Sequence, residues 1–165
     1  LTFFVSVPEE EKQMSWFNPI GLAWVLLLLL PNALYAARHP ELFENARHCR
    51  IVEIGEQIGR IGCFILMVFR VPRVVFGFFF PKGALVYVAV GSALVAAYAI
   101  GWLFAAKHPL FRAYYLSIVP SVLFLFCGGM TRDLALSAAA VLFSVCHITI
   151  SLKNAYAEKE RESAV

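Results

Sequence analysis

The sequence predicts an all-α membrane protein, a polytopic bundle of five transmembrane helices. Hydrophobic residues make up 61% of the 165 residues and charged residues only 15%, whereas soluble domains have about 45–50% apolar and about 25% charged residues. A helix needs about 20 residues to cross a bilayer, so the chain has room for five or six crossings and no second domain. Five apolar stretches separated by short polar breaks fill this length.

The residues before the first apolar stretch are predicted to lie outside the bundle. A span begins directly after Met14, and the run Glu9-Glu10-Glu11 would be encoded by purine-rich codons resembling a bacterial ribosome-binding site. We therefore interpret residues 1–13 as a translated leader. The alternative interpretation is an ordinary acidic, disordered tail.

The first two spans are bounded by prolines and charges. The first runs from about Pro19 to Ala36. Pro31 is expected to kink this span, because its ring removes a backbone donor and clashes with the preceding turn. The second span begins near Arg50 and is stopped by RVPR at residues 70–73.

The remaining three spans have short connections, and together the five spans form a single transmembrane domain over residues 14–153. They cover about 83–106, 110–130 and 133–152, separated by KHP and by TRD. Residues 154–165 are expected to form a polar cytoplasmic tail. An odd number of crossings places the two ends of the chain on opposite sides of the membrane.

Basic residues are distributed unevenly between the two predicted sides. Loops rich in Lys and Arg stay in the cytoplasm, and the split of eight against four, or five if Lys12 is present, predicts an outer N-terminus and an inner C-terminus. Basic residues in cytoplasmic loops also account for the net charge of +3, so no nucleic-acid partner is needed to explain it. The inner group is Arg38, Arg47, Arg50, Lys107, Arg112, Lys153, Lys159 and Arg161, and the outer group is Arg70, Arg73, Lys82 and Arg132.

The second span carries polar residues that it cannot keep outside the membrane. Only nine residues separate Arg60 from Arg70, which is about 14 Å of helix against a hydrocarbon core of about 30 Å. The helix must therefore use residues from about Ile51 onward to cross. This draws four polar side chains below the cytoplasmic interface: Glu53, Glu56, Gln57 and Arg60.

Those four side chains share one face of the helix, at about 100° per residue. Gly55, Gly59 and Gly62 lie on the opposite face, where small residues let a neighbouring helix approach closely. The polar face should look into the bundle or a water-filled cavity, because an intramembrane charge facing lipid costs about 2.5–3.5 kcal/mol. Glu56 and Arg60 are expected to pair at i, i+4.

Polar residues from three other spans are expected at the same depth. Asn32 and Tyr35 lie near the inner end of the first span, Arg112 opens the fourth, and His147 lies near the inner end of the fifth. The functional interpretation is a pocket that binds a substrate or relays protons. The structural interpretation is an ion-pair and hydrogen-bond cluster that locks helix packing, with His147 as a packing residue. A second structural interpretation is a helix that tilts little and protrudes into the cytoplasm, which leaves Glu53 in water and only Arg60 buried.

No metal site or cofactor site is predicted. His39, His48 and Cys49 are close in sequence but match no zinc-ligand spacing. The sequence contains no P-loop, no dinucleotide-binding fingerprint and no H-E-x-x-H motif.

Four segments resemble a family of small bacterial membrane proteins, mainly from anaerobic Gram-positive lineages. They are LLLLLPNALYAARHPELFEN, IVEIGEQIGRIGCFILMVF, LSIVPSVLFLFCGGM and CHITISLKNA, and the resemblance covers most of the chain from Met14 onward. It implies a five-span fold in the bacterial plasma membrane. It implies no particular activity and no catalytic residue.

Three classes of function remain open. The first is a small transporter or membrane-complex subunit, which at this length would need to dimerise or join a larger assembly. The second is a membrane-embedded enzyme for a lipid or hydrophobic substrate, with Glu56 as acid or base and a pocket opening laterally between the second and fifth helices. The third is an accessory membrane protein without a site.

Overall fold

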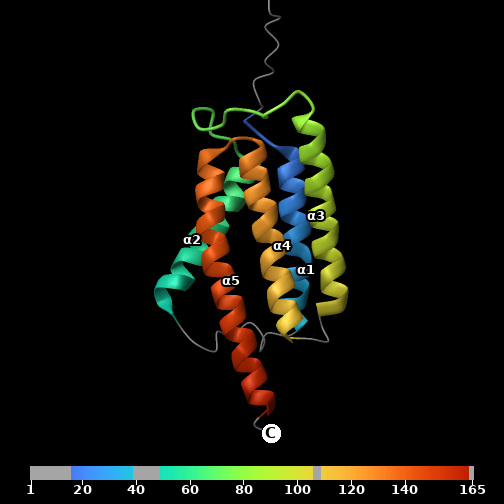
Figure 1. Ribbon diagram of the computed structural model, residues 1–165, viewed down its shortest axis with the longest axis vertical. Helices are drawn as coiled ribbons and strands as arrows, with labels where there is room; N and C mark the ends of the chain where they lie inside the picture. Colours follow the sequence, from blue (N-terminus) through green and yellow to red (C-terminus); the bar gives the residue numbers. More distant parts are fainter. Residues whose placement is uncertain (1–15, 39–48, 106–108, 164–165) are drawn as a thin grey trace, which may run out of the picture.

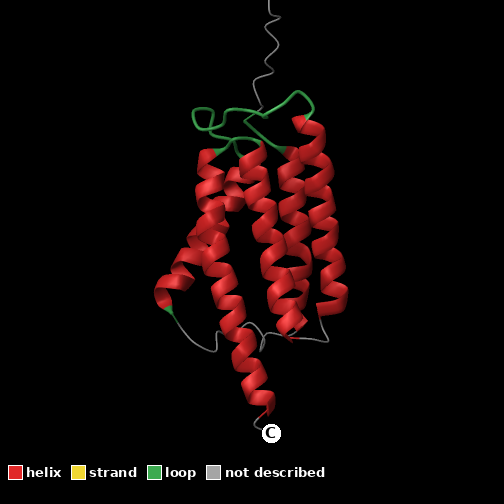
Figure 2. Ribbon diagram, viewed as in Figure 1, coloured by secondary structure: helices red, strands yellow, loops and turns green. Residues whose placement is uncertain are grey.

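Five helices make up the fold (Figure 1). The structure, a computed structural model, describes residues 16–38, 49–105 and 109–163. The described residues contain no β-strand, only two isolated bridges between loop residues (Figure 2), so the all-α prediction is confirmed. The helices are α1 Pro19–Arg38, α2 Arg50–Val68, α3 Gly83–Ala105, α4 Pro109–Met130 and α5 Leu134–Ser163.

The helix boundaries lie close to the predicted ones except at the end of the chain. α5 continues to Ser163, so the polar segment expected from residue 154 extends this helix instead of leaving it. The segment contains Ala, Lys and Glu, which are strong helix formers, and lacks Pro and Gly. The leader predicted for residues 1–13 lies outside the described part of the chain.

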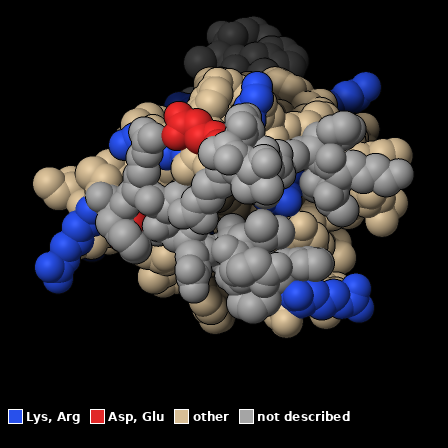
Figure 3. All heavy atoms as spheres, turned by 90° about the horizontal axis from the view of Figure 1, so that it is seen from below, with Lys and Arg blue, Asp and Glu red and all other residues tan. Residues whose placement is uncertain are grey.

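The helices run up and down, so the two ends of the described chain lie at opposite ends of the bundle (Figure 1). The start of α1 lies at the same end as the α2–α3 loop and the α4–α5 turn, and the C-terminal part of α5 projects from the other end. Lys and Arg side chains project around the rim of the molecule seen from that second end (Figure 3).

Four helices, α1, α3, α4 and α5, are long and apolar enough to cross a membrane. Their outward faces are correspondingly apolar, as shown by Leu85, Leu103 and Val145, whose side chains are 70%, 78% and 64% exposed. The chain is therefore a multi-pass membrane protein. α2 has a similar length but carries four charged residues among its 19, and its crossing remains a prediction.

The predicted glycine face of α2 is confirmed, and it packs against α5. A Cβ atom at Gly59 would lie 2.6 Å from the backbone nitrogen of Phe143, and one at Gly55 would lie 2.9 Å from Sγ of Cys146. Real Cβ atoms do not approach backbone that closely, so the two helix backbones meet here only because position 59 has no side chain.

Asn18 ties the start of α1 to the end of α2. Its side-chain amide donates to the carbonyl of Met67 (2.9 Å) and lies 3.0 Å from the hydroxyl of Tyr87 on α3. Its backbone nitrogen donates to the carbonyl of Val68 at 2.8 Å. From this joined end, α1 and the N-terminal half of α2 diverge toward the other end of the bundle (Figure 1).

Candidate functional site

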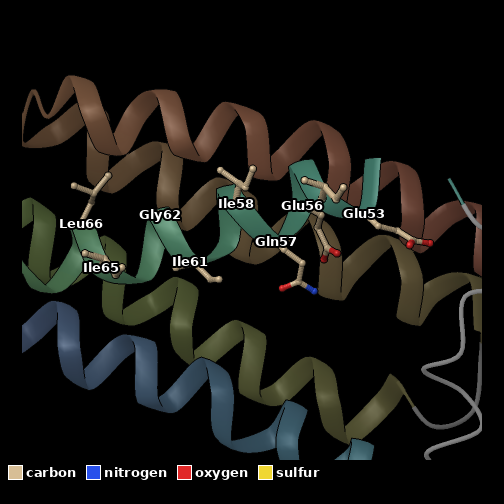
Figure 4. A pocket seen from close by; sticks show the side chains of 9 residues that line it. Glu53, Glu56, Gln57, Ile58, Ile61, Gly62, Ile65 and Leu66 are labelled. Atoms are coloured by element: carbon tan, nitrogen blue, oxygen red, sulfur yellow. The ribbon is translucent and has the colours of Figure 1, made fainter. Parts of the chain in front are cut away.

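One side of α2, from Glu53 to Leu66, lines an open pocket of about 670 Å³. Figure 4 shows the carboxylates of Glu53 and Glu56 and the amide of Gln57 toward one end of the pocket and the apolar side chains toward the other. The described lining residues all belong to α2: Glu53, Ile54, Glu56, Gln57, Ile58, Ile61, Gly62, Ile65 and Leu66.

Glu56 is the centre of the polar cluster. The residue is only 6% exposed, and its Oε1 atom accepts a hydrogen bond from the guanidinium of Arg60 one turn along α2. The Nδ1 atom of His147, on α5, lies 2.8 Å from the same oxygen. The predicted i, i+4 pair is confirmed, and the structure adds a partner from a second helix.

Packing holds the imidazole of His147 in place. The ring stacks on Phe143, one turn earlier in α5, with centroids 4.7 Å apart and planes inclined by 17°. Phe143 is also the residue against which Gly59 packs. The close α2–α5 contact therefore positions both partners of the bond between Glu56 and His147.

Tyr35 and Arg112 form a second polar group on other helices. The Arg112 guanidinium donates to the Tyr35 hydroxyl at 3.3 Å and lies 6.0 Å from its ring centroid. The Tyr35 ring packs at 4.8 Å on Trp102 of α3, which in turn makes an edge contact with Tyr98 at 6.3 Å. In the described part of the chain, the buried Nε1 atom of Trp102 has no hydrogen-bond partner.

The aromatic residues of α3 were missed by the sequence analysis. Tyr98 is 2% exposed. Trp102 connects Tyr98 to Tyr35 through ring contacts. The third span is uniformly apolar, and its sequence holds no periodic signal that would single out these rings.

The predicted site residues, apart from Asn32, thus fall into two groups. Glu53 and Gln57 line the pocket with Glu56, whose carboxylate binds Arg60 and His147. Tyr35 and Arg112 belong to the second group. Asn32 lies half-buried in α1, one turn before Tyr35. His39 and His48 lie outside the described residues.

The α2–α5 seam is closed where an enzyme pocket was expected to open. The backbone of α2 at Gly59 is in direct contact with α5 at Phe143, which leaves no lateral entrance at this point of the seam. The pocket lies instead along the exposed side of α2, where Ile58 is 61% and Ile61 is 55% exposed.

The chain matches no protein-family model, no curated protein and no solved structure. A carboxylate held between a guanidinium and an imidazole can exchange a proton with the imidazole while the guanidinium keeps its charge.

Proposed function

We propose that this chain is a small transporter, or a subunit of a larger membrane complex, with an ionisable site in the cytoplasmic half of its bundle. The observation that carries the proposal is the buried carboxylate of Glu56, which is shared by Arg60 and by His147 beside an open pocket. Intramembrane ionisable residues mark substrate pathways and proton relays.

The proposal includes five crossings, with the N-terminus outside and the C-terminus inside a bacterial plasma membrane. α2 has 19 residues, which is about 28 Å of helix and close to the thickness of the hydrocarbon core. The uneven split of basic residues supports the orientation. The resemblance to small five-span bacterial proteins supports the location.

The proposed role of the cluster is to bind and release a proton as a substrate enters or leaves. The ionisable groups that contact Glu56 are Arg60 on α2 and His147 on α5, and Glu53 lines the same pocket. A proton taken up by the Glu56–His147 pair would change the charge at the polar end of the pocket. A charged substrate in the pocket would therefore be coupled to that proton.

We further propose that a second copy or another subunit completes the assembly. The described residues that line the pocket come from one helix. Further helices would enclose the pocket.

The test compares ligand stabilisation in wild type and in variants of the cluster. Glu56→Ala leaves Arg60 and His147 without the carboxylate and should cost about 3 kcal/mol, the low end for a broken buried pair, because the Arg60 side chain is 35% exposed. The double variant Glu56→Met/Arg60→Met replaces the pair by apolar side chains and should fold with nearly wild-type stability.

Thermal unfolding of these proteins in detergent would be measured against a panel of ions, lipids and metabolites. A functional site predicts that some compound raises the melting temperature of wild type but not of the double variant. A third variant, Glu56→Gln, would be measured in the same way. If no compound distinguishes wild type from the double variant and Glu56→Gln is strongly destabilised, the cluster is structural and the proposal is wrong.

A membrane-embedded enzyme is the second candidate, because the apolar end of the pocket is exposed along α2 and a lipid could reach it. Mass spectrometry of lipids incubated with the purified protein would test this. Turnover that depends on Glu56 would favour the enzyme over the transporter.

A further inference from the structure

A second pocket lies where α4 turns into α5, at the opposite end of the bundle from the N-terminal half of α2 (Figure 1). It measures about 360 Å³ and is lined by the last turn of α4, the first turn of α5 and part of the α2–α3 loop. Both helices are apolar enough to cross a membrane. The turn between them therefore lies at a membrane surface, at the depth of the lipid headgroups.

Arg132 is the charged residue among the described residues that line this pocket. Its guanidinium carbon lies 5.7 Å from the ring centroid of Phe76 and 5.4 Å from that of Phe79, within the limit of about 6 Å for a cation–π contact. The residue is exposed, and its backbone has the left-handed φ of 52°. Within the described part of the chain, no carboxylate pairs with this guanidinium.

The two ring contacts leave the hydrogen-bond donors of Arg132 available. A cation–π contact uses the charge of the guanidinium and not its N–H groups. Those N–H groups form a planar fork, and phosphate oxygens accept two parallel bonds from such a fork. The rings of Phe76 and Phe79 thus hold a phosphate-binding group at the edge of the pocket.

The charges at this end of the bundle favour an anion. The segments 69–82 and 131–133, which connect helices here, hold four basic residues and one acidic residue: Arg70, Arg73, Lys82, Arg132 and Asp133. Asp133 is 1% exposed, and its carboxylate caps α5, so it cannot receive an amine from a ligand. A headgroup with both a phosphate and an amine would find a partner only for the phosphate, which favours a headgroup with net negative charge.

An apolar surface leads from the pocket into the membrane. No described atom lies within 4 Å of the position that a Cβ atom would take at Gly129, at the end of α4. Leu125 lies one turn deeper on the same face of α4, and Val141 lies one turn deeper than Ser137 on α5. Both side chains are exposed. An acyl chain can therefore extend from the pocket along α4 and α5.

We propose that this pocket binds an anionic phospholipid, whose phosphate accepts hydrogen bonds from Arg132 while an acyl chain follows the exposed faces of α4 and α5. A soluble phosphate would use the guanidinium alone, whereas a lipid also uses the apolar lining. None of the described lining residues belongs to the cluster around Glu56, so this site is independent of the proposed function.

Two lipids with identical acyl chains test the proposal. Dioleoylphosphatidylglycerol is anionic and dioleoylphosphatidylcholine is zwitterionic, and each would be titrated into delipidated protein in detergent and counted by native mass spectrometry. We expect the first phosphatidylglycerol to bind about tenfold more tightly than phosphatidylcholine. Glycerol 3-phosphate, which has the phosphate but no acyl chain, should not displace it at equal concentration.

Variants of the cation then locate the headgroup. Arg132→Gln should weaken binding of phosphatidylglycerol about tenfold, because it removes the charge-assisted bonds to the phosphate. Arg73→Gln changes the net charge equally, lies in the same connecting segment and is outside the described lining, so it should leave binding unchanged. Arg132→Gly should weaken binding as much as Arg132→Gln and should fold, since glycine adopts a φ of 52° without strain.

A second pair of variants locates the acyl chain. Gly129→Leu places a side chain in the open space beside Arg132 without changing the charge, and should weaken binding of phosphatidylglycerol several-fold. Ala93→Leu adds the same bulk at an exposed position of α3 outside the described lining, and should have no effect.

Three results would overturn the inference: equal binding of the two lipids, equal binding of phosphatidylglycerol by Arg132→Gln and Arg73→Gln, or its displacement by glycerol 3-phosphate at equal concentration. The last result would mean that the pocket takes a soluble phosphate. The double variant Glu56→Met/Arg60→Met should bind phosphatidylglycerol as wild type does, which separates this site from the one in the proposed function.

Discussion

Glu56 shows how a single ionisable residue is accommodated inside this bundle. An isolated buried carboxylate would cost several kcal/mol, and two partners offset that cost here, Arg60 on the same helix and His147 on α5. The first partner could be predicted from the i, i+4 spacing. The second could not, because it lies 91 residues away and is brought close only by helix packing.

Asp133 is a second buried carboxylate, in the turn before α5. It is 1% exposed, and its Oδ1 atom accepts a hydrogen bond from the backbone nitrogen of Leu136 at 2.9 Å, so it caps the N-terminus of α5. Burial raises the pKa of the Asp133 carboxyl above its ordinary value, and the bonds from the amides of Leu136 and Ala135 oppose this only in part.

Asp133→Asn should therefore stabilise the protein at neutral pH, because asparagine keeps the cap and avoids the buried charge. Because the pKa of Asp133 is higher in the folded than in the unfolded state, protonation of this carboxyl stabilises the fold. The stabilisation is complete below about pH 4, the pKa in the unfolded state, and is lost as the pH rises through the folded pKa. The advantage of Asn over Asp should accordingly shrink on acidification. Thermal unfolding of both proteins between pH 4 and pH 8 measures this difference.

Asp133→Ala is the control for the cap, and should be less stable than Asp133→Asn by about 0.5–2 kcal/mol at every pH, because neither side chain titrates. If Asp133→Asn is as unstable as Asp133→Ala at neutral pH, the ionised carboxylate is needed and the argument from burial is wrong.

α2 is the element on which the candidate site depends, and each of its faces has a different role. Its glycine face packs on α5, its polar face carries Glu56 and Arg60, and its isoleucines are exposed. The helical period of 3.6 residues predicts which residues share each face. Which neighbour each face meets does not follow from the period, and α5 was identified as the partner only by the structure.

Gly59→Ala should separate α2 from α5 and destabilise the protein by about 1–3 kcal/mol, as overpacking does. The added Cβ would lie 2.6 Å from the Phe143 backbone nitrogen, and a backbone atom cannot move aside as a side chain can. Gly129→Ala in α4 is the matched control, because nothing lies within 4 Å of its Cβ position. It should be neutral or slightly stabilising.

Thermal unfolding in detergent would compare the two glycine variants. The contact between Glu56 and His147 should loosen in Gly59→Ala as well, so this variant should also lose any ligand stabilisation. Equal stability of the two variants would contradict the close α2–α5 contact.

At the scale of the whole molecule, side-chain and loop contacts tie one end of the bundle together. Asn18 joins α1, α2 and α3, and the α2–α3 loop bonds to the α4–α5 turn, where the backbone nitrogen of Leu134 donates to the carbonyl of Val74 at 3.1 Å. The N-terminal half of α2 diverges at the opposite end (Figure 1). The polar end of the pocket, at Glu53 and Glu56, lies on this diverging half of α2.

Labelling of cysteines with a membrane-impermeant maleimide in spheroplasts should reveal whether α2 crosses the membrane. Native Cys49 precedes α2 and should react only after permeabilisation. In the variant Cys49→Ala/Lys82→Cys, the new cysteine at position 82 follows α2 and should react in intact spheroplasts. Cys63 and Cys127 are fully buried and should not react, and Cys146→Ala removes the remaining thiol. Reaction of both sites from the same side would mean that α2 does not cross.

The sequence by itself determined the class of the protein, the helices, the glycine and polar faces of α2 and the pair of Glu56 with Arg60. These features depend on composition and on the spacing of residues within one helix, and both can be read from a short stretch of sequence. Only the tertiary structure decided that His147 completes the cluster, that Asn18 joins three helices and that Tyr35 meets Arg112. Those contacts join residues that are far apart in the chain, and they depend on how each helix is rotated and tilted against its neighbours. An apolar helix face packs equally well on many partners, so the sequence does not specify this rotation and tilt.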